Sequence, residues 1–391
     1  MQLMNIGYIV QQGYPYSYGS GIHAFELAKE LTKLGHELHI ITKGEPNQSP
    51  YEKFKDVHLH RILSFLPTPY YFPLNPLLLW REGKKIIDKL QLDLLIGHGF
   101  EASLFFRMRK KVPFIYKAAG TIELQKLRQF LTWHDIIGKV YFPVLGRLEK
   151  MATLHANSII AISDTIKQEL IEIYKIPMKK IQRIYNGVDV ERFKPSRNKL
   201  SLKRKMGLDA RRVILFVGRL SPIKGPQLLL QAIPLVLRKF PDVFFVFIGD
   251  GPLSSYLQVM IQKLHVGDSV KLLGFKSNIK MPNYFAMADI CVIPSMYEPF
   301  GLVSLESLAS GTPILTSNVG GLAEVHRILN ILPTISPLTP FNIAIQLNNL
   351  LAQPEKIEQL GQKGRKLVSQ YFTWKQCAEN TNKFIEKLRK K

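Results

Sequence analysis

The sequence predicts an α/β protein built from two doubly wound domains. With 391 residues the chain is too long for one ordinary hydrophobic core and fits two. Short apolar runs alternate with helical patterns, as in parallel sheets that are covered on both faces. The series of runs starts again after a polar, basic stretch at residues 186–212, which predicts the hinge between the domains.

The first half of the chain supplies the strands and helices of one such domain. The segment IHAFELAKELTKLG at residues 22–35 has apolar residues three and four apart and stops at Gly35, which predicts a helix. The predicted strands are IGYIV (6–10), ELHIIT (37–42), LDLLIG (92–97), PFIYKA (113–118), SIIAIS (158–163) and IQRIYN (181–186).

The second half repeats the pattern. Its predicted strands are RVILFVG (212–218), VFFVFIG (243–249), VKLLGF (270–275), ICVIPS (290–295) and PILTS (313–317). Sheets of this kind bind ligands beyond the carboxyl ends of their strands. A dehydrogenase would need G-x-G-x-x-G directly after the first strand, and the sequence there, QQGYPYSYGSGIHAF, does not match.

Composition indicates a folded protein without a membrane span. Hydrophobic residues make up 46% and charged residues 21% of the chain, and no run approaches the roughly 18 apolar residues that a span needs. The start of the sequence lacks the features of a signal peptide, so we expect a cytoplasmic location. Cys291 and Cys377 have neither metal-type spacing nor a paired framework, which predicts two buried thiols.

The formal net charge of +23 indicates an anionic partner. Three kinds of partner are considered: nucleic acid, an anionic membrane surface and an anionic small substrate. We expect no nucleic acid, because zinc-finger spacing, an RNP-like signature and a basic heptad region are all missing. An anionic membrane surface fits residues 105–114 and 138–150, where basic and apolar side chains alternate, so a peripheral position on the cytoplasmic face is expected. An anionic small substrate needs only a local basic pocket, and a merely solubilising basic face is the plain alternative.

Two cations follow the first strand of the second half. Arg219 and Lys224 bracket a Ser-Pro turn in RLSPIKG, where each can neutralise a different oxygen of a diphosphate. A solvated turn is the competing interpretation, since such side chains are usually exposed. The next predicted strand ends in IGDGP, where Gly249 and Gly251 permit a tight turn before a helix.

Two acids surround a Pro-Phe-Gly turn in YEPFGLVSLES. The backbone amides of Phe300, Gly301 and Leu302 fall at the predicted start of a helix, which attracts an anion. Glu298 stands in the loop and can accept hydrogen bonds from sugar hydroxyls. Glu306 lies on the helix and can reach ribose hydroxyls. Taken singly, each acid also fits a solvated or capping role.

The motifs together resemble the retaining glycosyltransferases of family 4, which have the GT-B fold. GRLSPIKG, IGDGP, YEPFGLVSLES with its E-x7-E element, and GTPILTSNVGGLAE occur in the family's order and separations. The first half agrees through YGSGIHAFELAKELTKLGHELHIIT, AISDTIKQEL and IYNGVDVERFKP, and YFTWKQCAE resembles the start of the family's C-terminal helix. The resemblance covers nearly the full chain.

This resemblance implies an architecture. Residues 1–190 would form an acceptor-side Rossmann-like domain, residues 191–372 a nucleotide-sugar-binding Rossmann-like domain facing it across a cleft, and residues 373–391 a helix crossing back to the first domain. It further implies that no cofactor and no metal takes part, since two cations and a helix N-terminus can stabilise a leaving diphosphate.

The resemblance also implies roles for single residues. Arg219 and Lys224 would contact the diphosphate, Glu306 the ribose, and Glu298 the donor sugar, so that Glu298, Arg219 and Lys224 form the catalytic set. Gly19 matches the glycine whose backbone faces the β-phosphate, where a side chain would prevent close approach.

Two departures from the family accompany these matches. Tyr18 precedes Gly19 where many members have a second glycine, and residues 119–121 read Ala-Gly-Thr where many relatives carry a histidine near the donor sugar. His23 and His98 are candidates to take part of that histidine's role, although a lone histidine is more often structural.

The resemblance therefore predicts retaining transfer of a hexose-type sugar from a nucleotide-diphosphate sugar to a hydroxyl, on a glycolipid or a growing glycan. A sugar-nucleotide 2-epimerase of the same fold and a non-catalytic, membrane-associated carbohydrate-binding scaffold are the alternatives. The aromatic and proline-rich residues 65–80 belong to the expected acceptor side, but they specify neither acceptor, sugar nor base.

Overall fold

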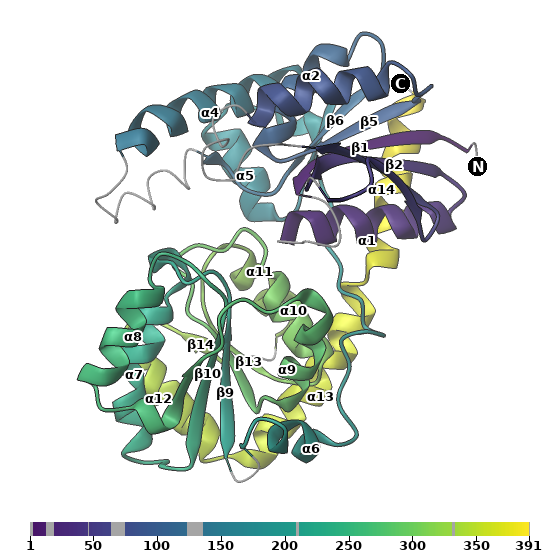
Figure 1. The fold of residues 1–391 in the computed structure, drawn as a ribbon. Helices are drawn as coiled ribbons and strands as arrows, with labels where there is room; N and C mark the ends of the chain where they lie inside the picture. The colour runs from purple at the N-terminus through teal and green to yellow at the C-terminus, as the bar shows by residue number, and fades with distance from the viewer. Residues whose placement is uncertain are drawn as a thin grey trace. The chain divides into compact units, whose positions relative to one another are not determined.

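The computed structural model describes residues 3–12, 19–45, 47–63, 75–122, 136–208, 211–330 and 333–390. The chain divides into two compact units (Figure 1). Unit 1 comprises Met1–Asn186 and Trp374–Lys391, and unit 2 comprises Gly187–Thr373. The first boundary lies four residues before the expected residue 190, and the C-terminal segment from Trp374 belongs to unit 1. Each unit is an α/β structure with a largely parallel sheet, which confirms the predicted fold class.

Within its described residues, unit 1 contains an eight-stranded sheet in the order β3-β4-β2-β1-β5-β6-β7-β8, parallel except for the β3–β4 pair. Its strands are β1 (Asn5–Gln12), β2 (Glu37–Gly44), β3 (Tyr51–Phe54), β4 (Val57–Leu63), β5 (Leu94–His98), β6 (Phe114–Ala118), β7 (Ser158–Ala161) and β8 (Ile181–Arg183). The chain moves from β1 toward one edge and returns through β5 to the other, so the topological switch point lies between β1 and β5.

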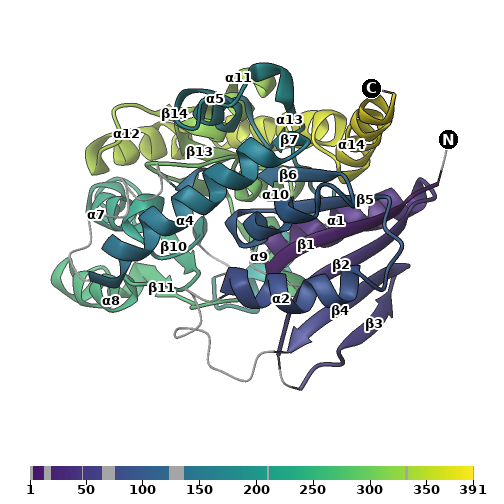
Figure 2. The ribbon, with the colours of Figure 1, turned by 90° about the horizontal axis from the view of Figure 1, so that it is seen from above.

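Helices cover both faces of this sheet, with α2 and α4 on one side and α1 packed with α14 on the other (Figures 1 and 2). The helical elements are α1 (Gly19–Lys33), α2 (Asn75–Ile87), the 3-10 helix η2 (Phe100–Met108), α4 (Ile136–His155), α5 (Asp164–Glu172), the 3-10 turn η3 (Met178–Lys180) and α14 (Trp374–Arg389). The α1–α14 contact includes a hydrogen bond of 3.0 Å between His36 Nε2 and Asn382 Oδ1.

The β3–β4 hairpin is absent from the sequence prediction. Its turn residues Lys55 and Asp56 both have positive φ, 48° and 64°, as tight hairpin turns require. Its strands carry Glu, Lys and His rather than an apolar run, because the hairpin lies at the edge of the sheet where one side remains exposed.

Unit 2 contains a six-stranded parallel sheet in its described residues, in the order β11-β10-β9-β12-β13-β14. Its strands are β9 (Arg212–Val217), β10 (Val243–Ile248), β11 (Val270–Leu272), β12 (Ile290–Ile293), β13 (Ile314–Ser317) and β14 (Thr334–Ile335). The chain fills one half from β9 outward and then the other half from β12, so the switch point lies between β9 and β12.

In unit 2, α7, α8 and α12 lie on one face of the sheet and α9, α10 and α13 on the other (Figure 1). The helical elements are α6 (Lys199–Arg204), the 3-10 turn η4 (Pro222–Lys224), α7 (Pro226–Leu237), α8 (Ser254–Lys263), α9 (Met281–Met287), α10 (Leu302–Ala309), α11 (Gly320–Leu329), α12 (Pro340–Leu351) and α13 (Pro354–Tyr371). Thus α6 lies inside the stretch predicted as the hinge, and it belongs to unit 2.

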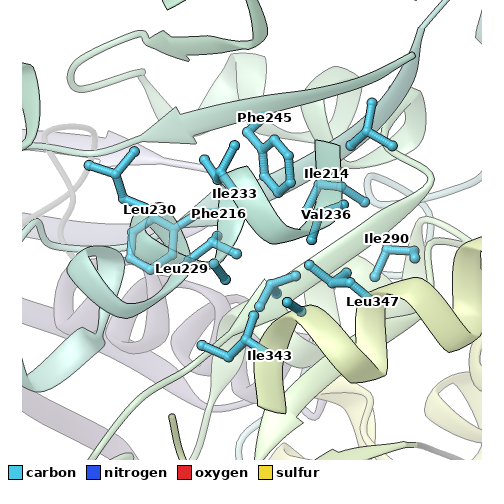
Figure 3. Close-up of a cluster of buried hydrophobic side chains, with 14 of the residues drawn as sticks. Ile214, Phe216, Leu229, Leu230, Ile233, Val236, Phe245, Ile290, Ile343 and Leu347 are labelled. Carbon is cyan, nitrogen blue, oxygen red and sulfur yellow. The ribbon is translucent and has the colours of Figure 1, made fainter. Parts of the chain in front are cut away.

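A buried apolar cluster holds α7 and α12 against the unit 2 sheet (Figure 3). Phe216 and Phe245 from the strands contact the layer formed by Ile233 of α7 and Leu347 of α12, and each of these four side chains is at most 1% exposed. Burying side chains of this size contributes about 1.5–3 kcal/mol each. This core fixes the strands whose carboxyl ends carry the candidate site.

Candidate active site

The candidate active site lies at the switch point of the unit 2 sheet. There β9 and β12 are neighbours, although about 70 residues separate them along the chain, and the loops that follow them leave the same edge. Ligands of doubly wound sheets bind at this position, because the loops diverge to opposite faces and leave a crevice. The loop after β9 carries Arg219 and Lys224, and the loop after β12 carries Glu298.

Lys224 and Glu298 form an ion pair across the switch point. Lys224 Nζ donates to Glu298 Oε2 over 2.7 Å, and the two side chains are 27% and 14% exposed. Ser295 Oγ lies 3.5 Å from the same carboxylate oxygen, and its backbone carbonyl accepts a hydrogen bond from Ser317 Oγ on β13. The paired charges are therefore fixed by two neighbouring strand ends while remaining within reach of a ligand.

Glycines allow the two loops to approach each other. Gly225, directly after Lys224, has φ of 72°, and a Cβ there would lie 2.0 Å from the carbonyl oxygen of Pro294. Gly320, at the start of α11, has φ of 49°, and a Cβ there would lie 2.2 Å from the carbonyl oxygen of Glu298. Any side chain at either position would move the backbone that carries the ion pair.

Arg219 lies on the same loop but does not join this pair. Its side chain is exposed, and no hydrogen bond from its guanidinium is found among the described residues. The loop backbone is tied to the turn after β10, since Leu220 N–H donates to the Asp250 carbonyl over 2.9 Å. A Cβ on Gly251 would lie 2.6 Å from the Leu220 carbonyl oxygen, which explains the glycine in IGDGP.

The start of α10 forms the third part of the site. Gly301 precedes the helix with φ of 94°, and no side chain caps the helix end. Phe300 is buried, with its ring edge-on to that of Phe372 at 6.2 Å between centroids, and Leu302 is the first helical residue. A helix N-terminus without a side-chain cap attracts an anion, because its first amides lack partners within the helix.

Glu306 projects from α10 one turn into the helix and is partly buried. Burial raises the pKa of its carboxyl to about 7, and the nearby guanidinium of Arg192 opposes that shift. No hydrogen-bond partner of this carboxyl is found within the part of the chain that the structure describes. A desolvated carboxyl of this kind is suited to accept hydrogen bonds from ligand hydroxyls.

The remaining predicted residues lie in unit 1, at the carboxyl edge of its sheet. Gly19 is the first residue of α1, and Tyr18 falls outside the described residues. His23 and His98 are buried at 1% and 4% exposure on either side of Tyr8, whose hydroxyl lies 3.4 and 3.2 Å from their Nδ1 atoms. They form a hydrogen-bonded interior cluster rather than an exposed pair.

The two histidines remain uncharged near neutral pH. Burial and the neighbouring Lys117 lower the pKa of His98 to about 3 and hold that of His23 well below its usual range. His23 Nε2 also bonds Asn186 Oδ1 over 2.6 Å, and its ring lies edge-on to Trp374 at 5.0 Å. At neutral pH these side chains can orient neighbouring groups, but they cannot supply a positive charge.

Sequence reasoning did not identify Lys117 as a notable residue. It lies one residue before the end of the apolar strand β6, is fully buried, and its Nζ has no hydrogen-bond partner among the described residues. Burial lowers the pKa of its amine. A lysine within a predicted buried strand is the signal that could have marked it. Cys377, as predicted, is a buried free thiol, and so is Cys291.

Comparisons with known proteins identify the family of the chain. Residues 18–192 match the model for Glycosyltransferase Family 4, and residues 199–367 match that for Glycosyl transferases group 1. The chain is 33% identical to a D-inositol 3-phosphate glycosyltransferase of Thermobispora bispora over 88% of this chain and 83% of that one. The protein therefore belongs to glycosyltransferase family 4.

Solved structures show the same fold at low identity. Sucrose-phosphate synthase from Thermosynechococcus elongatus has a TM-score of 0.84 and 21% identity, with 98% of this chain and 99% of that chain covered. Anabaena HepE in complex with UDP-glucose has a TM-score of 0.78 and 20% identity, with 98% and 100% covered. The chain is thus a glycosyltransferase enzyme of the GT-B fold.

Proposed function

We propose that the protein transfers a hexose-type sugar, with retention of configuration, from a nucleotide-diphosphate sugar to a hydroxyl on a glycolipid or growing glycan. The Lys224–Glu298 ion pair at the unit 2 switch point carries this proposal. It places a cation and a hydrogen-bond acceptor side by side at the edge where such sheets bind ligands. The UDP-glucose complex of the HepE structure supports a donor of this class.

The charges divide the work between leaving group and sugar. Lys224, Arg219 and the first amides of α10 stabilise the negative charge that develops on the departing diphosphate. Glu298 accepts hydrogen bonds from the donor sugar, and Glu306 accepts them from the ribose. Gly19 contacts the β-phosphate through its backbone.

Retention follows without a nucleophilic side chain in this proposal. Glu298 is neutralised by Lys224, so its carboxylate is better suited to hold hydroxyls than to attack a sugar carbon. The acceptor attacks from the face of the leaving group, whose phosphate oxygen takes the proton. No metal is required, because the cations and the α10 N-terminus already supply positive charge.

A donor screen followed by a transfer assay tests the proposal. UDP-, GDP- and ADP-sugars are compared by thermal shift, since a ligand that binds only the folded state raises its apparent stability. The preferred donor is then incubated with a glycolipid acceptor, with and without chelator, and the product's anomeric configuration is determined. Epimerised donor, or binding without turnover, would support the two alternative functions instead.

The acceptor side of the proposal involves a membrane surface, and the burial of the aromatic residues within 105–114 argues against the first segment expected to form it. Phe105 and Phe114 are completely buried, so the apolar half of residues 105–114 does not reach solvent. The expectation of exposed aromatic residues there was wrong, because Phe105 lies in η2, which packs against α2 and α4, and Phe114 begins the buried strand β6. Arg107, Lys110 and Lys111 remain exposed.

Exposed apolar residues instead gather on α4 and the adjoining η3 turn. Met151 and Leu154 are 43% and 44% exposed, and Met178 of η3 is 65% exposed. Lys180 Nζ binds the Leu154 carbonyl over 2.6 Å and thereby joins the two elements. We define the α4 surface by these apolar residues with Val144 and the exposed cations Arg147, Lys150 and Lys179.

The α4 surface is the proposed docking site for an anionic membrane. Charge complementarity favours this partner, since each Lys or Arg near an anionic surface contributes about 1 kcal/mol and the apolar side chains enter the headgroup layer. No helix in the described residues is long and apolar enough to cross a bilayer.

Vesicle sedimentation tests the α4 surface. Binding should increase with the fraction of anionic lipid, decrease at high salt, and fall when Arg147, Lys150 and Lys179 are changed to Gln. The matched control changes Lys263, Lys271 and Lys356 of unit 2, which are also exposed and carry the same total charge. Equal losses in the two triple variants would mean that net charge, and not this surface, holds the protein on vesicles.

A further inference from the structure

The turn at residues 119–122 lies at the ligand-binding edge of unit 1. It directly follows β6, whose last residues pair with the end of β5, next to the switch point between β1 and β5. The Gly99 amide donates to the Lys117 carbonyl over 3.1 Å and closes the loops after β5 and β6 together. Position alone therefore makes this turn a candidate to contact substrate.

A buried carboxylate on α4 holds the end of the turn. Glu149, 2% exposed, accepts a hydrogen bond from the Ile122 amide at Oε2 over 2.8 Å. The same oxygen accepts from the Tyr174 hydroxyl over 2.6 Å, and Oε1 accepts from the Tyr116 hydroxyl over 2.9 Å. Three donors from three separate segments thus converge on one carboxylate.

A second buried carboxylate holds the neighbouring residue. Thr121 Oγ1 donates to Glu169 Oε2 of α5 over 2.8 Å, and both residues are at most 7% exposed. The turn is therefore attached at two consecutive residues to two different helices, α4 and α5. A turn that needed only to connect β6 to the next element would require neither attachment.

We propose that Glu149 is a positioning residue for the transfer reaction, which sets the place of the 119–122 turn through its hydrogen bond to Ile122 so that the turn's backbone contacts the sugar substrates. The turn's contact with substrates rests on the proposed function. The attachment of the turn to Glu149 does not depend on that function. An ionised Glu149 binds the amide through a charge-assisted bond, which is roughly twice as strong as a neutral one. Ionisation of Glu149 therefore controls how firmly the turn is held.

The groups around Glu149 place this ionisation near neutral pH. Burial raises its pKa to about 7, the three hydrogen bonds lower it, and Glu169 of α5 raises it again. Glu101 of η2 is the other acid facing it, with a pKa that burial also raises to about 7. Burial holds the pKa of Tyr116 of β6, which donates to Oε1 of Glu149, well above its usual range.

The chemical shift of the Ile122 amide reports directly on the hydrogen bond by which Glu149 holds the turn. In protein labelled with ¹⁵N-isoleucine, the Ile122 amide resonance should titrate with a midpoint near pH 7 in the wild type. Glu149→Gln, which preserves shape and an acceptor, should abolish the titration. Glu101→Gln is the matched control, because it removes a partly buried acid of similar pKa that does not bind the turn. An Ile122 resonance that is constant from pH 5.5 to 8.5 in the wild type would refute the hold.

Activity tests whether the held turn contacts substrate. At pH 8, Glu149→Gln should lower kcat about ten- to hundredfold with little change in KM for the donor, while Glu101→Gln retains wild-type kcat. An unchanged kcat in Glu149→Gln would refute the positioning role, even where Ile122 titrates. If the wild type transfers no sugar, the proposed function and the turn's contact with substrate both fail. The Ile122 titration still tests separately whether Glu149 holds the turn.

Discussion

The two units use the same doubly wound plan but fill its switch point with opposite chemistry. In unit 2 the position between β9 and β12 carries Lys224 and Glu298, which are charged and partly exposed. In unit 1 the position between β1 and β5 is lined by Tyr8, His23 and His98, which are buried and uncharged near neutral pH. Topology therefore determines where each unit can bind a ligand, whereas burial determines whether that place carries charge.

This difference fits a division of labour between the units. A nucleotide diphosphate requires fixed charge, and unit 2 provides it from short loops whose glycines allow close approach. A neutral hydroxyl acceptor requires hydrogen-bonding groups and shape, which an uncharged, well-packed edge provides. The proposed assignment of donor to unit 2 and acceptor to unit 1 rests on this contrast.

Removing the cations of unit 2 should produce the largest effect. Lys224→Ala and Arg219→Ala should each lose about 2–4 kcal/mol of transition-state stabilisation, or roughly 30- to 1,000-fold in rate, and leave the fold intact. Steady-state transfer assays measure the loss of rate, and circular dichroism checks that the fold is intact. Lys271→Ala, an exposed cation on edge strand β11, is the control and should retain full rate. Wild-type turnover in both site variants would contradict the proposed role of Lys224 and Arg219 in stabilising the diphosphate.

Substitutions of the two acids of unit 2, Glu298 and Glu306, should have different effects on nucleotide affinity. Glu298→Gln should reduce turnover, with little change in affinity for the free nucleotide, whereas Glu306→Gln should weaken nucleotide binding as well, through the ribose. Lost hydrogen bonds to a charged group correspond to about 1.5–3 kcal/mol. Calorimetric titration with free nucleotide and steady-state kinetics measure the two effects. Identical nucleotide affinities in the two variants would contradict the division.

The sequence predicted the fold in detail where strands are buried on both faces. Apolar runs such as RVILFVG mark these strands without ambiguity, because a parallel strand has no polar side. The hairpin β3–β4 and the two-residue strand β14 were missed, since the edge strand β3 keeps polar residues, β4 alternates buried and partly buried residues instead of forming an apolar run, and very short strands have no period. Solvent exposure therefore explains most of the error.

The candidate site was predicted as residues but not as contacts. Glu298 and Lys224 each follow a recognisable strand, yet their pairing depends on β12 lying beside β9, which local patterns do not reveal. The Glu149 network was missed for a similar reason. Its three donors come from β6, the turn after it and the segment after α5, so only the folded chain brings them to one carboxylate.

The smallest expected effect concerns stability, and it tests the neutral character of unit 1. Lys117→Met replaces a buried amine that has no hydrogen-bond partner among the described residues with an apolar side chain of similar length. Removing that burial penalty should raise the free energy of unfolding by about 1–2 kcal/mol at pH 7. Lys110→Met, an exposed substitution in the same unit, should change it by less than about 0.5 kcal/mol.

The direction in which this stability gain changes with pH follows from the lowered pKa of Lys117. Burial lowers the pKa of Lys117 in the folded state, so the unfolded chain binds more protons between that pKa and the ordinary value of about 10.4. Wild-type stability from this group is therefore present above pH 10.4 and is lost as pH falls through the folded-state pKa. The advantage of Lys117→Met should be smallest near pH 10 and grow toward neutral pH in urea unfolding curves. A variant less stable than the wild type at pH 7 would show that the amine is charged and bound, and the two switch points would then differ less than their burial indicates.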